Sequence, residues 1–265
     1  MSRVSIIIPA WGDTPLLERA RESVLSQTYG DVELVVSAPS DGGPQTAVSA
    51  RFAGVSRSSG DWVGFCDADD WIEPNAVAEM LSAAEREHAD CVCCGIVRDG
   101  ADGRSVRRPF DAKGPSDTYN ALVNKLFRRE LLEGLSIDPA VTLGEDLMVT
   151  AQALAKARRI AEMDAAFYHY CESATSVTHV QDGRKRVKDL ARVGEILREA
   201  LSGPEFADFH DRVVRDALLL WIRHRVFDIR LWRELRSRMT GGLLSDPRHG
   251  IIKKGALACA WVLFG

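Results

Sequence analysis

Four short segments in the first hundred residues are apolar almost throughout: residues 4–8, 32–36, 62–66 and 91–97. A strand with one solvated face alternates apolar and polar side chains, whereas a continuous apolar strand is typical of a sheet covered by helices on both faces. Between the first two segments, residues 14–28 carry apolar side chains at the spacing of an amphipathic helix. The order strand, helix, strand predicts a βαβ unit and an α/β fold with a mostly parallel sheet.

The rest of the chain continues this pattern and then changes. A short helix or turn at residues 47–58 and a helix opened by Pro74 separate the later strands. Residues 99–116 are predicted as a polar loop with an exposed hairpin, 117–134 and 144–157 as helices, 165–170 as a last strand, and everything from 182 onward as helical.

Charge is distributed unevenly along the chain. The net charge is −4 at neutral pH, yet residues 1–183 are acidic and residues 184–265 are basic. We therefore expect two parts, an α/β domain at residues 1–182 and a basic helical C-terminal region at residues 183–265. A basic appendage favours an anionic partner, either lipid headgroups or a polyanionic acceptor. Nucleic acid is not expected as a partner.

The chain start lacks the charged and apolar regions of a signal peptide, and the cysteines show neither zinc spacing nor a secreted disulfide framework. These features predict a cytoplasmic protein. Near the C-terminus, Lys253 and Lys254 precede an apolar run, residues 255–265, that is too short to span a bilayer. The run either packs as a last helix or lies on the inner face of the membrane as a peripheral contact.

Three carboxylates directly follow the third apolar strand: Asp67, Asp69 and Asp70, with Ala68 between the first two. Open α/β sheets hold their ligands at strand ends of this kind. Carboxylates two residues apart can bind one hard divalent cation, and oxygen ligands suit Mg²⁺ or Mn²⁺. The same residues also fit a capped turn, with Asp70 as the cap of the helix that Pro74 opens. The tetrapeptide by itself leaves both interpretations open.

Further patches of sequence occur in a fixed order around this motif. They are the strand–helix–strand of residues 4–36, the stretch from Ser49 to Asp70, the segments at 124–131 and 144–147, and the stretch from Tyr168 to His179. In this order they resemble family 2 glycosyltransferases, inverting enzymes of the GT-A fold that include bacterial cell-surface glycan enzymes. The resemblance covers about residues 3–180 and implies a GT-A fold, with the helical region as an appendage.

The resemblance also implies a division of chemical roles. Asp67 and Asp69 would hold Mn²⁺ or Mg²⁺ against the diphosphate of a nucleotide-sugar donor, where the metal stabilises the leaving group. Asp146 would be the general base that deprotonates an acceptor hydroxyl, and Glu145 would orient that acceptor. Both lie near a predicted helix N-terminus, where the helix dipole favours an ionised carboxylate. Without the resemblance, the Glu145–Asp146 pair would fit simple helix capping.

The resemblance assigns the nucleotide sugar to Pro9, Ala10, Trp11, Asp41, Arg51, Asp67 and Ala68, and it makes His169 and His179 candidates for a phosphate or metal contact. A lone histidine in such a strand is, on the other hand, more often a core residue. The segment from Ser37 to Gly43 departs from the family pattern, in which consecutive acidic residues follow the second strand. Asp41 is the residue in this segment that could contact the base.

These observations predict a metal-dependent inverting glycosyltransferase. It would move a sugar from a nucleotide-diphosphate donor, expected to be a UDP-sugar, to a hydroxyl of a glycan or lipid-linked acceptor in cell-surface polysaccharide or glycolipid synthesis. A catalytically degenerate GT-A binding or scaffold protein is the alternative that the altered segment 37–43 favours. A nucleotidyltransferase is a third interpretation, but residues 9–14 lack the Gly- and Lys/Arg-rich sequence that grips phosphates.

Overall fold

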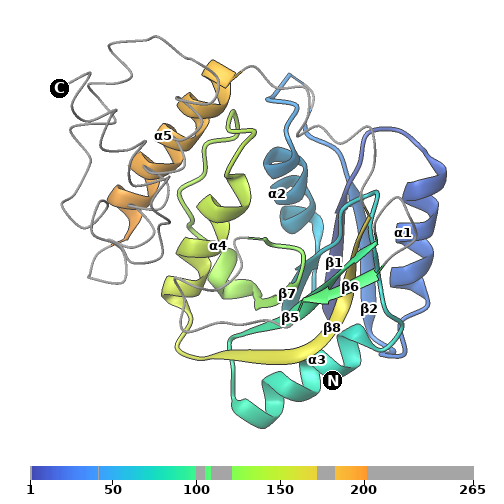
Figure 1. The fold of residues 1–265 in the computed structure, drawn as a ribbon. Helices are drawn as coiled ribbons and strands as arrows, with labels where there is room; N and C mark the ends of the chain where they lie inside the picture. The colour runs from blue at the N-terminus through green and yellow to red at the C-terminus, as the bar shows by residue number, and fades with distance from the viewer. Residues whose placement is uncertain (1, 41, 100–104, 109–120, 172–182, 202–265) are drawn as a thin grey trace. The chain divides into compact units, whose positions relative to one another are not determined.

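The computed structural model describes residues 2–40, 42–99, 105–108, 121–171 and 183–201 (Figure 1). The chain divides into two compact units. The first unit comprises Met1–Ala140 and Val149–Ser176, and the second comprises Val141–Met148 and Val177–Gly265. The predicted domain boundary at residue 182 stays a prediction.

The first unit is built on a mixed sheet. Its strands are β1 (Val4–Pro9), β2 (Val32–Ser37), β3 (Trp62–Phe65), β4 (Trp71–Ile72), β5 (Cys91–Asp99), β6 (Ser105–Arg108), β7 (Lys125–Arg128) and β8 (Ile160–Cys171). Among the described residues the order across the sheet is β2-β1-β3-β7-β5-β8-β4, and β6 pairs with β5.

Parallel pairing joins the strands that carry the sequence motifs. β1 is parallel to both β2 and β3, with Val4 opposite Val32 on one side and Trp62 on the other. β5 and β8 form a second parallel pair, and β7 links the two groups because it is antiparallel to both β3 and β5. Because β1, β2 and β3 run in the same direction, their carboxyl ends meet at one edge of the sheet. The predicted α/β fold is confirmed.

Helices α1 (Pro15–Leu25), α2 (Ala47–Arg57) and α3 (Ala76–Glu87) flank this sheet (Figure 1). Ile6 and Ile8 of β1 belong to the core that also contains the buried residues of α1 and α3. Ile7 points to the opposite face, where a Cβ atom built on Gly54 of α2 would lie 2.5 Å from its Cγ2 atom. The continuous apolar sequence of β1 is therefore explained by helices on both faces.

The first two helices begin at threonine caps. The Thr14 side chain accepts a hydrogen bond from the Leu17 backbone N–H at 3.1 Å, and Thr46 accepts one from Ser49 at 3.3 Å. α3 ends at His88, whose backbone is left-handed with φ 52°. The predicted helix at residues 14–28 is thus confirmed, and residues 47–58, predicted as a short helix or turn, form a helix.

The helix predicted for residues 117–134 is wrong in the part that the structure describes. Strand β7 is followed by a single 3-10 turn, η1 (Arg129–Leu132). Leu126 and Phe127 point to opposite faces of the sheet and are 3% and 0% exposed. A strand between β3 and β5 buries both side chains and satisfies its backbone on two sides, so tertiary pairing overrides the helical spacing of the sequence.

Two further strand predictions have different outcomes. The antiparallel pairing of β5 and β6 confirms a hairpin in the polar segment, with Asp99 opposite Ser105, while residues 100–104 lie outside the described part. The last strand begins at Ile160, earlier than predicted, because its first residues pair in parallel with Cys91 and Cys93 of β5.

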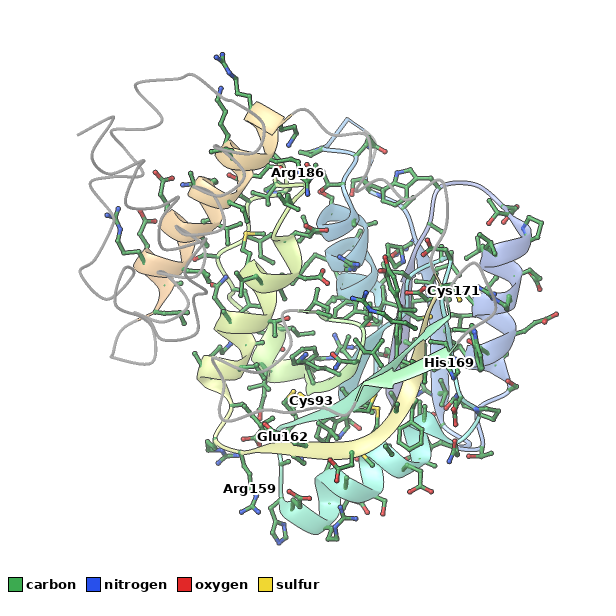
Figure 2. All side chains as sticks on the ribbon, in the orientation of Figure 1. Cys93, Arg159, Glu162, His169, Cys171 and Arg186 are labelled. Carbon is green, nitrogen blue, oxygen red and sulfur yellow. The ribbon has the colours of Figure 1, made fainter. Side chains whose placement is uncertain are left out.

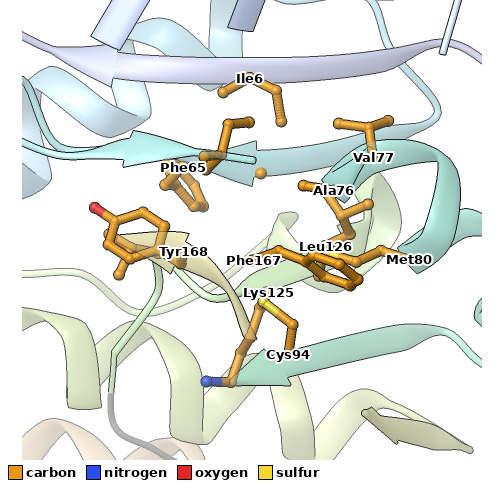
Figure 3. A pocket seen from close by; sticks show the side chains of 13 residues that line it. Ile6, Phe65, Ala76, Val77, Met80, Cys94, Lys125, Leu126, Phe167 and Tyr168 are labelled. Carbon is orange, nitrogen blue, oxygen red and sulfur yellow. The ribbon is translucent and has the colours of Figure 1, made fainter. Parts of the chain in front are cut away.

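A small cavity of about 20 Å³ lies in the core of the first unit, between α3 and the sheet (Figure 3). Phe65, Phe167 and Tyr168 contribute to its wall, which is apolar except for Lys125 and the tyrosine hydroxyl. The Lys125 Nζ atom donates to the Ala121 carbonyl at 2.7 Å and to Asn124 Oδ1 at 2.8 Å. The cavity has room for about one water molecule, so it cannot hold a nucleotide.

The second unit contains residues 141–148 and helix α5 (Gly183–Ala200) within the described part of the chain. α5 buries Val187, Val193 and Leu197 along one face. Helix α4 (Glu145–Lys156) begins in this unit, and its residues from Val149 onward count with the first unit. No helix among the described residues combines the length and apolarity needed to cross a bilayer.

Candidate active site

The candidate site of the first unit lies where β1 and β3 end. The loop after β3 carries Asp67, Ala68, Asp69 and Asp70, and it starts at the same edge at which β1 ends with Pro9. The Cys66 backbone N–H donates to the Ile7 carbonyl at 3.0 Å, which keeps the two strands paired up to the loop. The parallel sheet thus places the acidic loop beside the predicted base-pocket residues.

Arg51 reaches this loop from α2. Its Nη2 atom lies 2.7 Å from Asp67 Oδ1, and the Arg51 side chain is only 4% exposed while that of Asp67 is 33% exposed. A guanidinium held beneath a partly exposed carboxylate fixes the orientation of the carboxylate and leaves its outer side open to a ligand. The sequence resemblance linked these two residues only through the donor, and the structure shows a direct ion pair.

Asp69 is held through its backbone. Arg19 of α1 donates from Nη2 to the Asp69 carbonyl and, at 3.2 Å, to the Cys171 sulfur. The Asp69 carboxylate is itself half-buried, and burial together with the nearby charge of Asp67 raises its pKa. Arg19 had no role in the sequence interpretation, because nothing in a helical pattern indicates that one of its arginines reaches a loop fifty residues away.

Asp70 anchors the loop to β8. Its carboxyl group accepts hydrogen bonds from the Tyr168 hydroxyl and, at 2.8 Å, from the Cys171 backbone N–H. The Tyr168 oxygen in turn accepts the Asp67 backbone N–H at 3.2 Å. Asp70 is 1% exposed, and burial together with the charge of Asp67 raises its pKa to about 8. Asp70 therefore supports the loop through partners on β8. The alternative that made Asp70 the cap of the helix opened by Pro74 is wrong, because the N-cap residue of α3 is Asn75.

His169 lies next to Tyr168 on the opposite face of β8, close to Cys171 along the strand (Figure 2). Its ring stacks on Trp71 with centroids 3.5 Å apart, and its Nε2 atom lies 3.3 Å from Glu73 Oε1. The predicted phosphate or metal contact of His169 stays a prediction. The other histidine candidate, His179, lies outside the described residues.

The predicted base pocket is described only in part. Pro9 and Ala10 are buried at the end of β1, and the Ala10 N–H donates to the Ser37 carbonyl of β2 at 2.9 Å. Trp11 follows with 49% of its surface exposed, as a pocket wall open to solvent would be. Asp41, the candidate for contact with the base, lies outside the described residues.

The predicted general base, Asp146, belongs to the second unit. Helix α4 begins with Glu145, and the Gly144 carbonyl accepts the first helical hydrogen bond from Met148 at 2.9 Å. Glu145 and Asp146 therefore stand in the first turn and are partly exposed, where the helix dipole favours their ionised forms. The helix predicted for residues 144–157 is confirmed, while the catalytic roles stay predictions.

The residues of the acidic loop fit a divalent cation that is bound partly by the protein and partly by substrate phosphates. Among the described residues no group of three or more His, Cys, Asp or Glu side chains is gathered as a metal cluster. Mg²⁺ in nucleotide sites is commonly held by one or two carboxylates together with substrate phosphates and water. Asp67 and Asp69 could supply these two carboxylates. Burial and the charge of Asp67 raise the pKa of Asp69, and a cation between the two carboxylates would offset that charge.

The chain matches one family model and several known sequences. Residues 43–139, which include α2 and the acidic loop, match the family model described as Glycosyl transferase family 2. The chain is 25% identical over 219 residues to the uncharacterized glycosyltransferase EpsJ of Bacillus subtilis, covering 67% of this chain and 63% of EpsJ. It is 27% identical over 275 residues to the succinoglycan biosynthesis protein ExoO of Rhizobium meliloti, covering 88% of this chain and 75% of ExoO.

Solved structures show the same fold. TarS of Staphylococcus aureus, residues 1–349 in complex with UDP, matches with a TM-score of 0.64 at 13% identity, covering 92% of this chain and 82% of that one. The mannosyltransferase PcManGT of Pyrobaculum calidifontis, in complex with GDP-Man and Mn²⁺, matches with a TM-score of 0.57 at 17% identity, covering 99% and 80%. The arrangement of strands and helices described above is therefore that of GT-A glycosyltransferase structures.

Proposed function

We propose that the chain is a member of glycosyl transferase family 2 and that it is a metal-dependent inverting glycosyltransferase. It moves a sugar from a nucleotide-diphosphate donor to a hydroxyl group of a glycan or lipid-linked acceptor in cell-surface polysaccharide or glycolipid synthesis. The matched segment spans 63% of the length of EpsJ, so the activity of the whole protein is part of the proposal.

One observation carries the proposal: the buried Arg51 guanidinium orients Asp67 at the carboxyl end of β3, beside Asp69. A structural ion pair alone would not need a second, half-buried carboxylate whose pKa is raised by burial and, in addition, by the charge of the first. The loop is also anchored from two sides, by Arg19 and by Tyr168. Such anchoring supports a preorganised binding loop rather than a simple turn.

In the proposed reaction Asp67 and Asp69 would hold Mn²⁺ or Mg²⁺, which would supply Lewis-acid stabilisation of the departing diphosphate. Arg51 keeps Asp67 in its binding rotamer and adds positive charge beneath the loop. Ala68 carries no side chain beyond Cβ, so the backbone between the two ligands leaves space for the donor. Trp11 and Pro9, at the end of β1, form the wall against which the base stacks.

Asp146 is the proposed general base. It accepts the proton of the acceptor hydroxyl while the oxygen attacks the anomeric carbon, and the configuration of that carbon is inverted. Glu145, its neighbour in the first turn of α4, orients the acceptor. The helix N-terminus favours an ionised carboxylate, the form that a base requires.

UDP-sugars are the proposed donors, and the complex of TarS with UDP supports this choice. The similarity to ExoO, a succinoglycan biosynthesis protein, supports a role in cell-surface polysaccharide synthesis. We place the protein in the cytoplasm, with its basic C-terminal region as a peripheral contact to the inner face of the membrane. That contact is tested by deleting residues 251–265, which should move the protein from the membrane fraction to the soluble fraction; an unchanged distribution would refute it.

The first experiment is a thermal-shift series with UDP, GDP, ADP, CDP and TDP, each with and without Mn²⁺. A ligand that binds only the folded state raises the melting temperature by mass action. We expect a shift with UDP that requires Mn²⁺, and its loss in Asp69→Asn. The control is Asp13→Asn, because the Asp13 side chain is 96% exposed in the helix-entry loop. A shift that survives in Asp69→Asn would refute the metal assignment, and no shift with any nucleotide would favour the degenerate binding protein.

The second experiment tests the base. Asp146→Asn should lower turnover at least about a hundredfold, since a positioned general base contributes that much or more. Its affinity for UDP and Mn²⁺ should stay within a factor of two of the unaltered protein. Full turnover in Asp146→Asn would exclude Asp146 as the base.

A further inference from the structure

We propose that Asp189 of α5 is a positioning residue that fixes the segment carrying Asp146. The inference rests on the proposed function, because it assumes that Asp146 accepts the acceptor proton. It goes further by assigning α5, which had no role in the predicted site, to the control of the geometry of the base.

Asp189 holds Thr142, the residue that precedes α4 by three positions. Its Oδ2 atom accepts the Thr142 backbone N–H at 2.9 Å and the Thr142 hydroxyl at 2.7 Å. The carboxylate also pairs with Lys185, one helical turn earlier, at 3.0 Å to Oδ1 and 2.8 Å to Oδ2. Asp189 is 7% exposed, so these bonds are shielded from water. Hydrogen bonds to a buried charged group are stronger than neutral ones.

The same segment meets α5 at a second point. Gly144 has a φ of +82°, a conformation that side chains rarely adopt, and a Cβ atom there would lie 2.8 Å from Leu190 Cδ2. Leu190 follows Asp189 directly, so one turn of α5 meets residues 142–144 through a polar contact at Thr142 and an apolar contact at Gly144. Only Leu143 separates Thr142 from Gly144. The backbone of residues 142–144 is therefore held at both ends, just before the helical turn that carries Asp146.

Precise placement of a base has a direct kinetic consequence. A displacement of about 1 Å in a reacting group can lower the rate by about a hundredfold, although nothing that touches the substrate has been removed. The first turn of α4 directly follows the residues that α5 holds, so their position bears on that of Asp146. Loosening Thr142 should therefore displace Asp146 and lower kcat, while the donor loop at Asp67 and Asp69 belongs to a different segment and keeps its affinity for nucleotide.

The main test compares Asp189→Ala and Thr142→Val with Lys188→Gln, a control at an exposed position of α5. Asp189→Ala removes the oxygen that accepts both hydrogen bonds from Thr142, whereas Thr142→Val removes only the hydroxyl and keeps the backbone bond. We expect kcat to fall about tenfold or more in Asp189→Ala and less in Thr142→Val, with the donor KM and the affinity for UDP and Mn²⁺ within a factor of two. Thr142→Ser, which restores a hydroxyl, should restore kcat.

A double variant separates positioning from a general loss of structure. In the Asp146→Asn background, Thr142→Val should cause no further fall in the residual rate, because the group it positions is gone. An equal fall in both backgrounds, or a kcat within a factor of two of the unaltered protein in both single variants, overturns the proposal. If Asp189→Ala does not fold, Thr142→Val and its serine counterpart decide the question alone.

Failure of the proposed function gives a different pattern. If Asp146→Asn retains full turnover, Asp146 is not the base and the assignment of Asp189 falls with it. If Asp146→Asn loses turnover while Asp189→Ala and Thr142→Val keep theirs, the proposed function stands and the positioning role alone is refuted.

Discussion

Tyr168→Phe is the substitution that most directly tests whether the acidic loop is anchored to the sheet. The change removes one oxygen and keeps the ring, so it leaves no large cavity. That oxygen donates to the Asp70 carboxyl and accepts the Asp67 N–H at 3.2 Å. Each buried hydrogen bond contributes about 1 kcal/mol net, so we expect a loss of about 2 kcal/mol in the free energy of unfolding.

The assay is urea unfolding of the first unit followed by circular dichroism, with linear extrapolation to water. Tyr29→Phe is the matched control, because among the described residues its hydroxyl has one partner, the Ser2 carbonyl at 2.8 Å, which water can replace. The control should lose less than about 1 kcal/mol. A second measurement is hydrogen exchange of the Asp67 amide, which should become faster only in Tyr168→Phe. Equal stabilities of the two variants, with unchanged exchange at Asp67, would refute the anchoring.

Two further substitutions test other parts of the first unit. Gly60→Ala should destabilise the protein by at least about 2 kcal/mol, because the new Cβ would lie 2.6 Å from the Ser5 backbone nitrogen. Gly30→Ala is the control and should be nearly neutral, because a Cβ atom there meets open space. Similar urea midpoints for the two variants would contradict this prediction. Asp90 accepts the Arg158 backbone N–H at 2.9 Å and pairs with the Arg158 guanidinium, and these contacts lower the pKa of Asp90. Its stabilising effect is therefore present above about pH 4 and is lost as the pH falls further. Asp90→Asn should therefore cost about 1 kcal/mol at pH 7 and flatten the acid side of the stability profile; an unchanged acid slope would exclude this linkage.

The sequence predicted most of the strands and helices of the first unit because their cause is local. Residues 4–8 and 32–36 are apolar almost throughout, and helix 14–28 has an amphipathic repeat, so each element is predicted by its own residues. β7 is the exception. Its residues have helical spacing, and only the gap between β3 and β5, filled by segments distant in sequence, makes them a strand.

The candidate site shows the same division. The order of Asp67, Asp69 and Asp146 could be recognised in the sequence, because a family pattern preserves residue types and their spacing. The partners of these residues could not be recognised. Tyr168 lies about a hundred positions from Asp70, and Arg19 lies fifty positions from Asp69. No periodicity connects such pairs, since they are brought together only when strands and helices pack.

The sequence by itself therefore determined the α/β class, the resemblance to family 2 glycosyltransferases and the candidate carboxylates, all of which depend on residue type and on spacing along the chain. Tertiary structure alone decided the strand at residues 125–128, the ion pair of Arg51 with Asp67, and the clamp of Asp189 on Thr142. The physical reason is that hydrogen bonds and ion pairs act over a few ångströms in space, and separation along the chain does not indicate which distant side chains will meet that condition.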